Sequence, residues 1–365
     1  MSSLPNADLL HDRATIPVEP VSARDRRPRG AGAALRHQAI TVRRYHEDDG
    51  ALWRHFLASS SNGTLFHSLD FLAYHSPERF DVHHLMFDRA GKLLALLPAA
   101  IVSEPDGRRP LKSPYGGSVG GFVLPPWTDA VSTLALVDAL KRHTAAAGLD
   151  GVEMRLGPGL YDSSPNDQLS FALTASGFTL ACRWLTHVIS LPSSPQDVAS
   201  QLVHKRRRNY VRSALNQGVR VATAGPEHLP AFYRILEHNR AKHGARPTHT
   251  LSDLQRIFHL TPDRVRLFAC NLRGEMIAGA LVFELNPRVS SLFYLCHDDR
   301  FDRLRPATLA TLRVAQHYSR HGVRYLDLGP TTFDDLRVNE GLARFKEEME
   351  AVGFCRDTWR WERSA

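Results

Sequence analysis

Hydrophobic residues recur along this 365-residue chain with two different periods. Alternating apolar and polar positions predict strands, and apolar positions every three to four residues predict helices. In the first half, we expect strands over 82–87, 92–102, 151–156 and 178–191, and helices over 130–147 and 171–175. In the second half, we expect strands over 219–223, 265–271, 276–285, 289–295 and 325–328, helices over 227–243, 252–259, 306–320 and 340–350, and a last strand ending near residue 361. This order predicts an α/β protein with a mixed sheet covered by helices.

A basic segment separates the two halves. Residues 193–218 are predicted to form one connecting helix, with Ser194 as N-cap, Pro195 at the first helical position and Gly218 as C-cap. The helix holds five cations, which are Lys205, Arg206, Arg207, Arg208 and Arg212. Such a cluster is either a solvated face or a surface for phosphate or RNA, since arginine forks match phosphate oxygens. Arg208 and Arg212 are our candidate substrate contacts in this helix.

The two halves repeat one order of elements. Residues 147–158 and 321–330 each follow a predicted helix and hold a short strand that ends in Gly-Pro. Residues 176–179 and 352–355 each place Gly-Phe before a last strand. The repetition predicts two tandem domains, at 39–192 and 219–365, joined by the helix over 193–218. Residues 1–38 are rich in Pro, Arg, Ala and Gly without an apolar period, so we expect a disordered tail there.

Composition and charge limit the classes of function that this protein can have. The chain has a formal net charge of +8, which permits a phosphate-bearing ligand without requiring one. Its four cysteines lie far apart and its nineteen histidines show no paired ligand spacing, so we expect reduced thiols and no metal site. No stretch of about 20 apolar residues is present, and the first thirty residues have no apolar core of a signal peptide. We therefore expect a cytoplasmic protein without a membrane span.

The glycine-rich stretch over 112–121 is the one motif that suggests a hydrolase. Residues 116–120 match the G-x-S-x-G form of a nucleophile elbow, but an extended, proline-broken segment follows where the elbow needs a helix. A serine hydrolase is therefore disfavoured. We expect the stretch to line a substrate groove, with Tyr115 and Gly117 as candidate binding residues. Dinucleotide-binding and P-loop motifs are absent from the sequence.

Three segments resemble a known family. Residues 204–219 read HKRRRNYVRSALNQGV, and residues 325–330 and 339–348 read YLDLGP and NEGLARFKEE. These segments are similar to the connecting element and the C-terminal signature of Fem-like aminoacyltransferases and related large GNAT-type acyltransferases. The resemblance extends over residues 40–363. It implies a tandem GNAT fold and transfer of an acyl or aminoacyl group onto an amine.

The resemblance also implies site residues. It places Lys346 and the Phe345–Lys346 backbone against the carbonyl oxygen on which negative charge develops, and it makes Asn339 and Glu340 candidate substrate-binding residues. Pattern alone favours the other interpretation, a surface lysine paired with Glu350 at i+4. Members of the family often have an acidic residue in the glycine-rich stretch of the first domain. Residues 112–121 have none, so we assign no general base there.

The last two predictions concern Asp327 and the loop over residues 297–306, where a GNAT enzyme would bind its acyl donor. If Leu326 and Leu328 face the core, Asp327 faces the other way and can accept a proton from the attacking ammonium; the alternative is a hydrogen bond to a neighbouring loop. GNAT enzymes hold the coenzyme A pyrophosphate in a glycine-rich loop at a helix start, but the corresponding residues 297–306 contain no glycine. We therefore expect aminoacyl-tRNA as donor, with acyl-CoA or a carrier-protein thioester as the alternative, no further cofactor, and a small-molecule or peptide amine as acceptor. A non-catalytic RNA- or phosphate-binding module is the alternative from another class.

Overall fold

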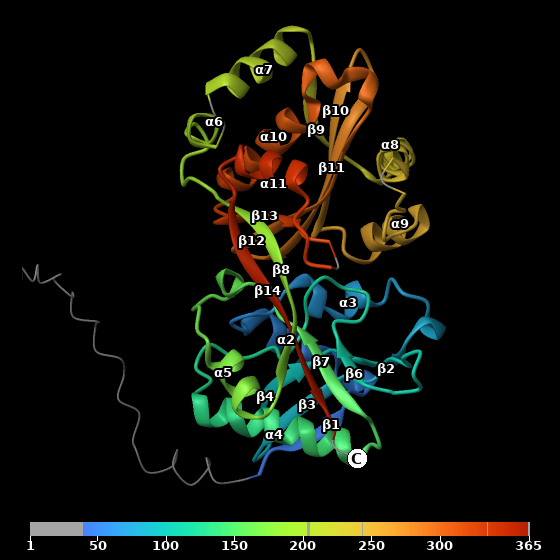
Figure 1. Ribbon diagram of the computed structural model, residues 1–365, viewed down its shortest axis with the longest axis vertical. Coiled ribbons are helices and arrows are strands. Elements are labelled where there is room, and N and C mark those ends of the chain that lie inside the picture. The colour runs from blue at the N-terminus through green and yellow to red at the C-terminus, as the bar shows by residue number, and fades with distance from the viewer. Residues whose placement is uncertain (1–38, 203–204, 243, 334, 364–365) are drawn as a thin grey trace, which may run out of the picture. The chain divides into compact units, whose positions relative to one another are not determined.

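A mixed sheet of eleven strands runs through the described part of the chain, which comprises residues 39–202, 205–242, 244–333 and 335–363 of the computed structural model (Figure 1). Its order is β2-β5-β6-β7-β14-β8-β13-β12-β11-β10-β9. The first-half strands are β2 (Asp81–Val82), β5 (Ala100–Ile101), β6 (Leu111–Ser113), β7 (Gly151–Arg155) and β8 (Thr179–Ser190). The second-half strands are β9 (Arg220–Ala224), β10 (Val265–Leu272), β11 (Glu275–Asn286), β12 (Val289–His297), β13 (Tyr325–Pro330) and β14 (Val352–Glu362). The predicted α/β class with a mixed sheet is confirmed.

A second, smaller sheet and the helices account for the other regular elements described here. The small sheet has the order β1-β3-β4 and comprises β1 (Thr41–Arg44), β3 (Leu85–Arg89) and β4 (Lys92–Leu97). The first-half helices are α2 (Gly50–Ser59), α3 (Leu69–Leu72), α4 (Ala130–Ala146) and α5 (Gln168–Ala175). The others are α6 (Val198–Gln201), α7 (Lys205–Asn216), α8 (Leu229–Ala241), α9 (Leu251–Leu260), α10 (Pro306–Arg320) and α11 (Glu340–Glu347). None of the helices in the described residues is long and apolar enough to cross a bilayer. The tail predicted over residues 1–38 lies outside the described residues.

The connecting segment differs from its prediction. It forms two helices, α6 and α7, and the first begins at Val198 instead of directly after Ser194. Asp197 occupies the N-cap position of α6, and the Ser194 hydroxyl donates to Gln196 Oε1 at 2.8 Å. The predicted C-cap is confirmed, because Gly218 has a φ of 92° and its N–H donates to the Leu215 carbonyl at 3.1 Å.

Both halves turn their first long hairpin in the same way. Ala90 and Gly91 join β3 to β4 with φ values of 51° and 73°, and Arg273 and Gly274 join β10 to β11 with φ values of 51° and 86°. Two consecutive residues with positive φ match the right-handed twist of the flanking strands. The two turns therefore occupy equivalent positions in the repeat.

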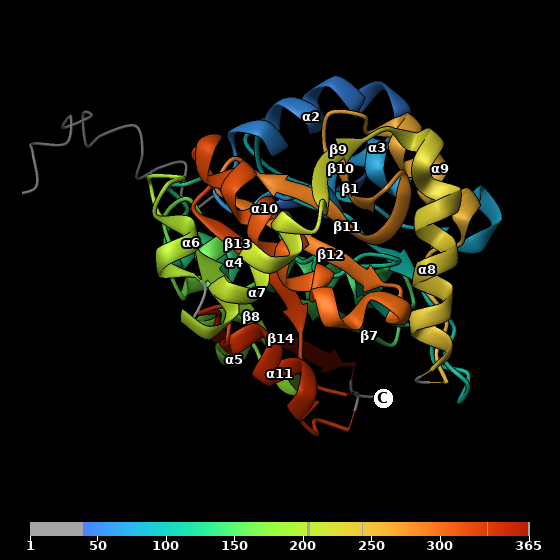
Figure 2. The ribbon, with the colours of Figure 1, turned by 90° about the horizontal axis from the view of Figure 1, so that it is seen from above.

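The sheet of the second half is buried on both faces. Leu281, Phe283 and Leu285 of β11 pack in one core cluster with residues of α8 and α9, whereas Ala280 and Val282 pack in another with residues of α10. Figure 2 shows α8 and α9 on one side of β10–β12 and α10 on the other. Successive side chains of a strand point to opposite faces, so continuous apolar runs predict this double cover.

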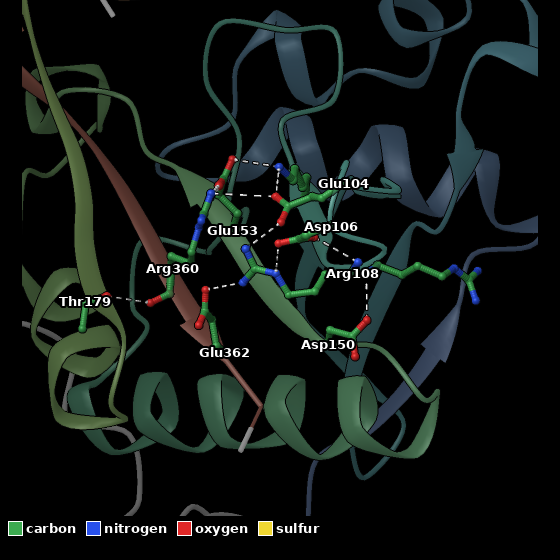
Figure 3. Close-up of polar contacts among 10 residues, drawn as sticks. Glu104, Asp106, Arg108, Asp150, Glu153, Thr179, Arg360 and Glu362 are labelled. Atoms are coloured by element: carbon green, nitrogen blue, oxygen red, sulfur yellow. Dashed lines mark hydrogen bonds and ion pairs between the residues drawn. The ribbon is translucent and has the colours of Figure 1, made fainter. Parts of the chain in front are cut away.

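Strands β8 and β14 link the two halves. β14 pairs with β8 from Val352 to Arg360 and with β7 from Thr358 to Glu362, so the last strand enters the sheet of the first half. Figure 3 shows its charged end: Arg360 Nη2 lies 2.5 Å from Glu153 Oε2, and Arg108 Nη1 lies 2.5 Å from Glu362 Oε1. The bounds assigned to the two domains remain a prediction, to which the structure adds these shared strands.

Candidate functional site

Two parallel strands separate at the centre of the second half. β12 and β13 pair over only three positions, from Val289↔Tyr325 to Ser291↔Asp327. Beyond them β12 continues beside β11, and β13 continues beside β8, with which it pairs from Tyr325 onward. The register with β8 shifts between Asp327 and Pro330, where Pro330 pairs with Thr186. Gly329 allows this irregularity with a φ of 78°, in the left-handed region that favours glycine. The separation leaves the last carbonyls of β13 free to bind a side chain.

Lys346 of α11 occupies this place. Only 4% of its surface is exposed, and Nζ donates to the Gly329 carbonyl at 2.7 Å and the Pro330 carbonyl at 3.0 Å. Burial lowers the pKa of Lys346 to about 7. An ammonium has three N–H groups, so one remains without a partner among the described residues. Lys346 is therefore not the surface lysine paired with Glu350, and its role at a carbonyl oxygen stays a prediction.

A pocket of about 400 Å³, called here the α7–α10 pocket, adjoins this helix. Arg207 forms one wall: its Nη1 donates to Thr308 Oγ1 at 3.0 Å, its guanidinium lies 5.5 Å from the centre of the Phe345 ring, and it forms an ion pair with Glu348. The other lining residues are Tyr210, His297, Asp302, Arg305, Pro306 and Ala307. Because Glu348 pairs with Arg207, the features that favour an anionic ligand are Arg305 and the N-terminal turn of the 15-residue helix α10.

The arginines selected from the sequence lie elsewhere on α7. Arg208 and Arg212 are exposed and do not line the α7–α10 pocket, whereas Arg207 does. Residues three or four apart share a helix face, so Arg207 and Tyr210 lie on one face and Arg208 and Arg212 on another. The charge run in the sequence located this helix correctly but did not reveal which face would meet α10.

The other binding residues selected from the sequence lie in different parts of the fold. Tyr115 is buried, and its hydroxyl lies 3.1 Å from His84 Nε2; neither it nor Gly117 lines the α7–α10 pocket. Asn339 is the N-cap of α11, because its Oδ1 accepts the N–H of Leu342 at 3.1 Å. Glu340 is exposed in the first turn of that helix. Asn339 therefore contributes by orienting α11, the helix that holds Lys346.

Asp327 is enclosed by hydrogen-bond donors. Its Oδ1 accepts from Thr186 Oγ1 at 2.7 Å and from the Gly329 N–H at 2.6 Å. Its Oδ2 accepts from the Tyr161 hydroxyl and forms a short ion pair with Arg356. Burial favours the neutral acid, but Arg356 and the hydrogen bonds hold the pKa of Asp327 below its usual value. A carboxylate with both oxygens occupied is well suited to holding the two halves together.

Asp327 points to the face opposite Leu326 and Leu328: the two leucines belong to one core cluster, and Tyr161, which binds Asp327, belongs to the other. Leu326, Asp327 and Leu328 are all buried, because the sheet is covered on both faces at this strand. The geometry therefore favours the alternative, a hydrogen-bonded structural role, over proton acceptance. Tyr161 and Arg356 were not selected from the sequence, and no local pattern around either residue marks it as a partner of Asp327.

One group of metal-ligand side chains comes together in the described residues. It comprises His297, Asp299 and Asp302, whose ligand atoms lie within 4.8 Å of one another. His297 Nε2 already lies 2.7 Å from Asp302 Oδ1, and Asp299 forms an ion pair with Lys242. Because these exposed groups are paired within the protein, their geometry gives no reason to assign a metal ion.

Comparisons with known proteins agree with this architecture. Residues 203–347 match a family model described as Acetyltransferase (GNAT) domain, whereas no curated protein sequence matches the chain significantly. A crystal structure of FemX resembles the chain with a TM-score of 0.69 and 13% identity, over 88% of this chain and 97% of that one. A tandem GNAT protein from the clavulanic acid biosynthesis pathway has a TM-score of 0.54 and 11% identity, over 89% and 99%. L-PGS from Bacillus licheniformis has a TM-score of 0.55 and 12% identity, over 88% and 94%.

Identities this low show a shared fold, and they confirm the architecture that the sequence resemblance implied. The domain match extends over α7 and Lys346. The chain therefore has the Fem-like fold of two GNAT-like domains, and its residues 203–347 match an acetyltransferase (GNAT) domain.

Proposed function

We propose that this protein transfers an acyl or aminoacyl group from a phosphate-bearing donor to an amine and so forms an amide. One observation supports this most directly: Phe345 lines the α7–α10 pocket, and the next residue, Lys346, is a buried lysine with one N–H that has no partner among the described residues. A donor whose phosphate binds Arg207 and Arg305 brings its reactive carbonyl toward Lys346.

The chemistry needs no covalent enzyme intermediate. The amine nitrogen attacks the carbonyl carbon, the new C–N bond forms, and the ester C–O or thioester C–S bond breaks. The amine loses one proton, and the leaving alcohol or thiol gains one. Negative charge develops on the carbonyl oxygen, where the remaining N–H of Lys346 can donate a hydrogen bond. The protein then acts by positioning the reactants and stabilising charge.

Aminoacyl-tRNA is the donor we favour. Arg208 and Arg212 are exposed on α7 outside the pocket, so basic charge continues along the helix beyond the space that a single small ligand fills. A polyanion uses such an extended surface, whereas acyl-CoA or a carrier-protein thioester needs mainly the pocket. The acceptor is a small-molecule or peptide amine.

Transfer is tested by incubating the protein with mixed aminoacyl-tRNAs or acyl-CoAs and a set of amines, with mass spectrometry of new amides as the readout. Enzyme-dependent amide formation from aminoacyl-tRNA is expected. Products from acyl-CoA alone would move the assignment to the alternative donor. Tight tRNA binding without any amide product, unaffected by Lys346→Met, would favour the non-catalytic RNA-binding module instead.

A salt titration tests the donor surface separately. Each phosphate contact contributes roughly −0.7 to −0.9 to the log–log slope of tRNA affinity against salt. Replacing Arg207 and Arg208 with Gln should flatten that slope by about 1.4 to 1.8. Replacing the exposed Arg109 and Arg142 of the first half with Gln removes equal charge and should leave the slope unchanged. Equal slopes in both double variants would show that α7 does not contact tRNA.

A further inference from the structure

The first half contains a strand pair equivalent to the one beside Lys346. β6 and β7 run parallel over three positions, from Leu111↔Val152 to Ser113↔Met154, and α4 connects them as α10 connects β12 and β13. A pocket of about 230 Å³ lies at this place, lined by Thr128 and Thr133 at the start of α4 and by Leu156 and Gly157 after β7. We call it the α4 pocket.

The α4 pocket has the opposite electrostatic character to the α7–α10 pocket. Its described lining includes Asp162, Asp167 and Asp357 but no lysine or arginine. Asp357 is neutralised by Arg183 at 2.7 Å. A phosphate or another anion would therefore meet carboxylates here without a cation, so a donor like that of the second half does not fit.

Asp162 is the carboxylate without a partner. Within the described chain, its side chain makes no ion pair and no hydrogen bond, although it is half-buried. Burial raises the pKa of Asp162 to about 7; the charge of Arg288 opposes this shift and that of Asp167 adds to it. A cation placed next to a partly buried carboxylate with a raised pKa stabilises its charged form.

His67 supplies an independent sign of a ligand. It is 2% exposed and lines the same pocket. Its Nδ1 accepts the Thr64 N–H at 3.1 Å, and burial lowers the ring's pKa to about 4, so the neutral ring holds its proton on Nε2. This Nε2 has only a weak backbone contact, to Gly120, and no full hydrogen-bond partner within the described residues. A buried donor without a partner destabilises the protein by about 1–3 kcal/mol unless a ligand or water satisfies it.

We propose that the α4 pocket binds a small molecule that has a protonated amine, held by Asp162, and a hydrogen-bond acceptor, held by His67 Nε2. A cavity of 150 Å³ accommodates benzene, so the pocket has room for a molecule the size of an amino acid or an amino sugar. Tyr161 lines the pocket and its hydroxyl binds Asp327, which accepts the Gly329 N–H. The occupant therefore contacts the same network that supports the Lys346 site.

Ligand-detected NMR and isothermal titration on the full chain test this site. The probes are ethanolamine, glycine and glucosamine, each compared with an amine-free counterpart, namely ethylene glycol, acetate and glucose. At least one amine should bind at pH 8 while its counterpart does not. Asp162→Asn should weaken binding tenfold or more. Asp138→Asn, which changes an exposed carboxylate on α4, should leave binding unchanged.

The pH dependence provides a second readout that needs no substitution. With a carboxyl pKa of about 7, the charged fraction of Asp162 rises from about one tenth at pH 6 to about nine tenths at pH 8. The amines of ethanolamine and glycine stay protonated over this range, and His67 stays neutral; glucosamine, whose amine loses its proton near pH 8, is left out of this titration. Affinity should therefore increase about ninefold from pH 6 to pH 8 in the native protein and stay constant in Asp162→Asn.

Three results would overturn the proposal. The first is that none of the amines binds the folded native protein. The second is that Asp162→Asn binds them as the native protein does. The third is that Lys346→Met loses the binding, which would place the amine in the transfer site instead. The assay contains no acyl donor, so its outcome is independent of whether the protein transfers acyl groups.

Discussion

Replacing Lys346 with Met removes the ammonium from the Gly329 and Pro330 carbonyls while keeping a side chain of similar length. If the remaining N–H stabilises the carbonyl oxygen during transfer, its loss removes one oxyanion donor. Removing such a donor typically lowers turnover by about 10²–10³, or roughly 3–4 kcal/mol of transition-state stabilisation. Substrate binding should change less than turnover, because the hydrogen bond strengthens as charge develops.

The same substitution should leave the fold intact. The pKa of Lys346 falls from 10.5 to about 7, which corresponds to roughly 4–5 kcal/mol of unfavourable burial of the ammonium at neutral pH and below. Methionine removes that penalty but leaves two carbonyl oxygens without a donor, at about 1–3 kcal/mol each. These effects oppose each other, so we expect a change in unfolding free energy of no more than about 3 kcal/mol in either direction.

The assay is single-turnover transfer with the donor at saturation, alongside urea unfolding of each variant. Arg344→Met is the matched control, because it removes a cation from an exposed position of the same helix and should retain native turnover. Turnover of Lys346→Met within threefold of the native value, in a protein that unfolds normally, would refute a role for Lys346 in the transfer step.

The other predictions concern the surroundings of Lys346. The lowered pKa of about 7 means that Lys346 carries a charge mainly below that pH. Turnover of the native protein should therefore decrease as pH rises through 7, because the Lys346 ammonium is lost, and Lys346→Met should lack that decrease. Folding stability should rise between about pH 7 and 10.5, since the unfolded chain binds the extra proton there; a flat urea midpoint across this range would contradict the burial of a charged lysine. Asp327→Asn should lower the unfolding free energy by about 3–5 kcal/mol because it leaves Arg356 buried without a counter-charge, and a loss under 1 kcal/mol in urea unfolding would disprove that pairing. Gly329→Ala meets no atom within 4 Å, so its expected cost of about 1–2 kcal/mol comes only from the φ of 78°, and an unchanged stability would argue against that conformation.

Features that depend on neighbouring residues could be predicted from the sequence. The turn at Arg273 and Gly274 and the helix end at Gly218 follow from glycine's freedom at positive φ. The apolar periods located the helices and strands because each reflects the geometry of one element. The repetition of these elements then predicted two domains, and the family resemblance led to Lys346.

Features that depend on contacts between distant segments required the structure. Asp327 is 29 residues from Arg356 and 166 residues from Tyr161 along the chain, so no local pattern could reveal that its carboxylate would be occupied. The same limit explains why Arg208 was selected from the basic run in place of Arg207, since only the packing of α7 beside α10 decides which arginine enters the pocket. The sequence by itself therefore determined the elements, their order and the two-domain class, because these arise from interactions within a few residues. Tertiary packing alone decided the burial of Lys346, the pairing of Asp327 and the lining of both pockets, because burial and charge pairing are set by side chains brought together from separate parts of the chain.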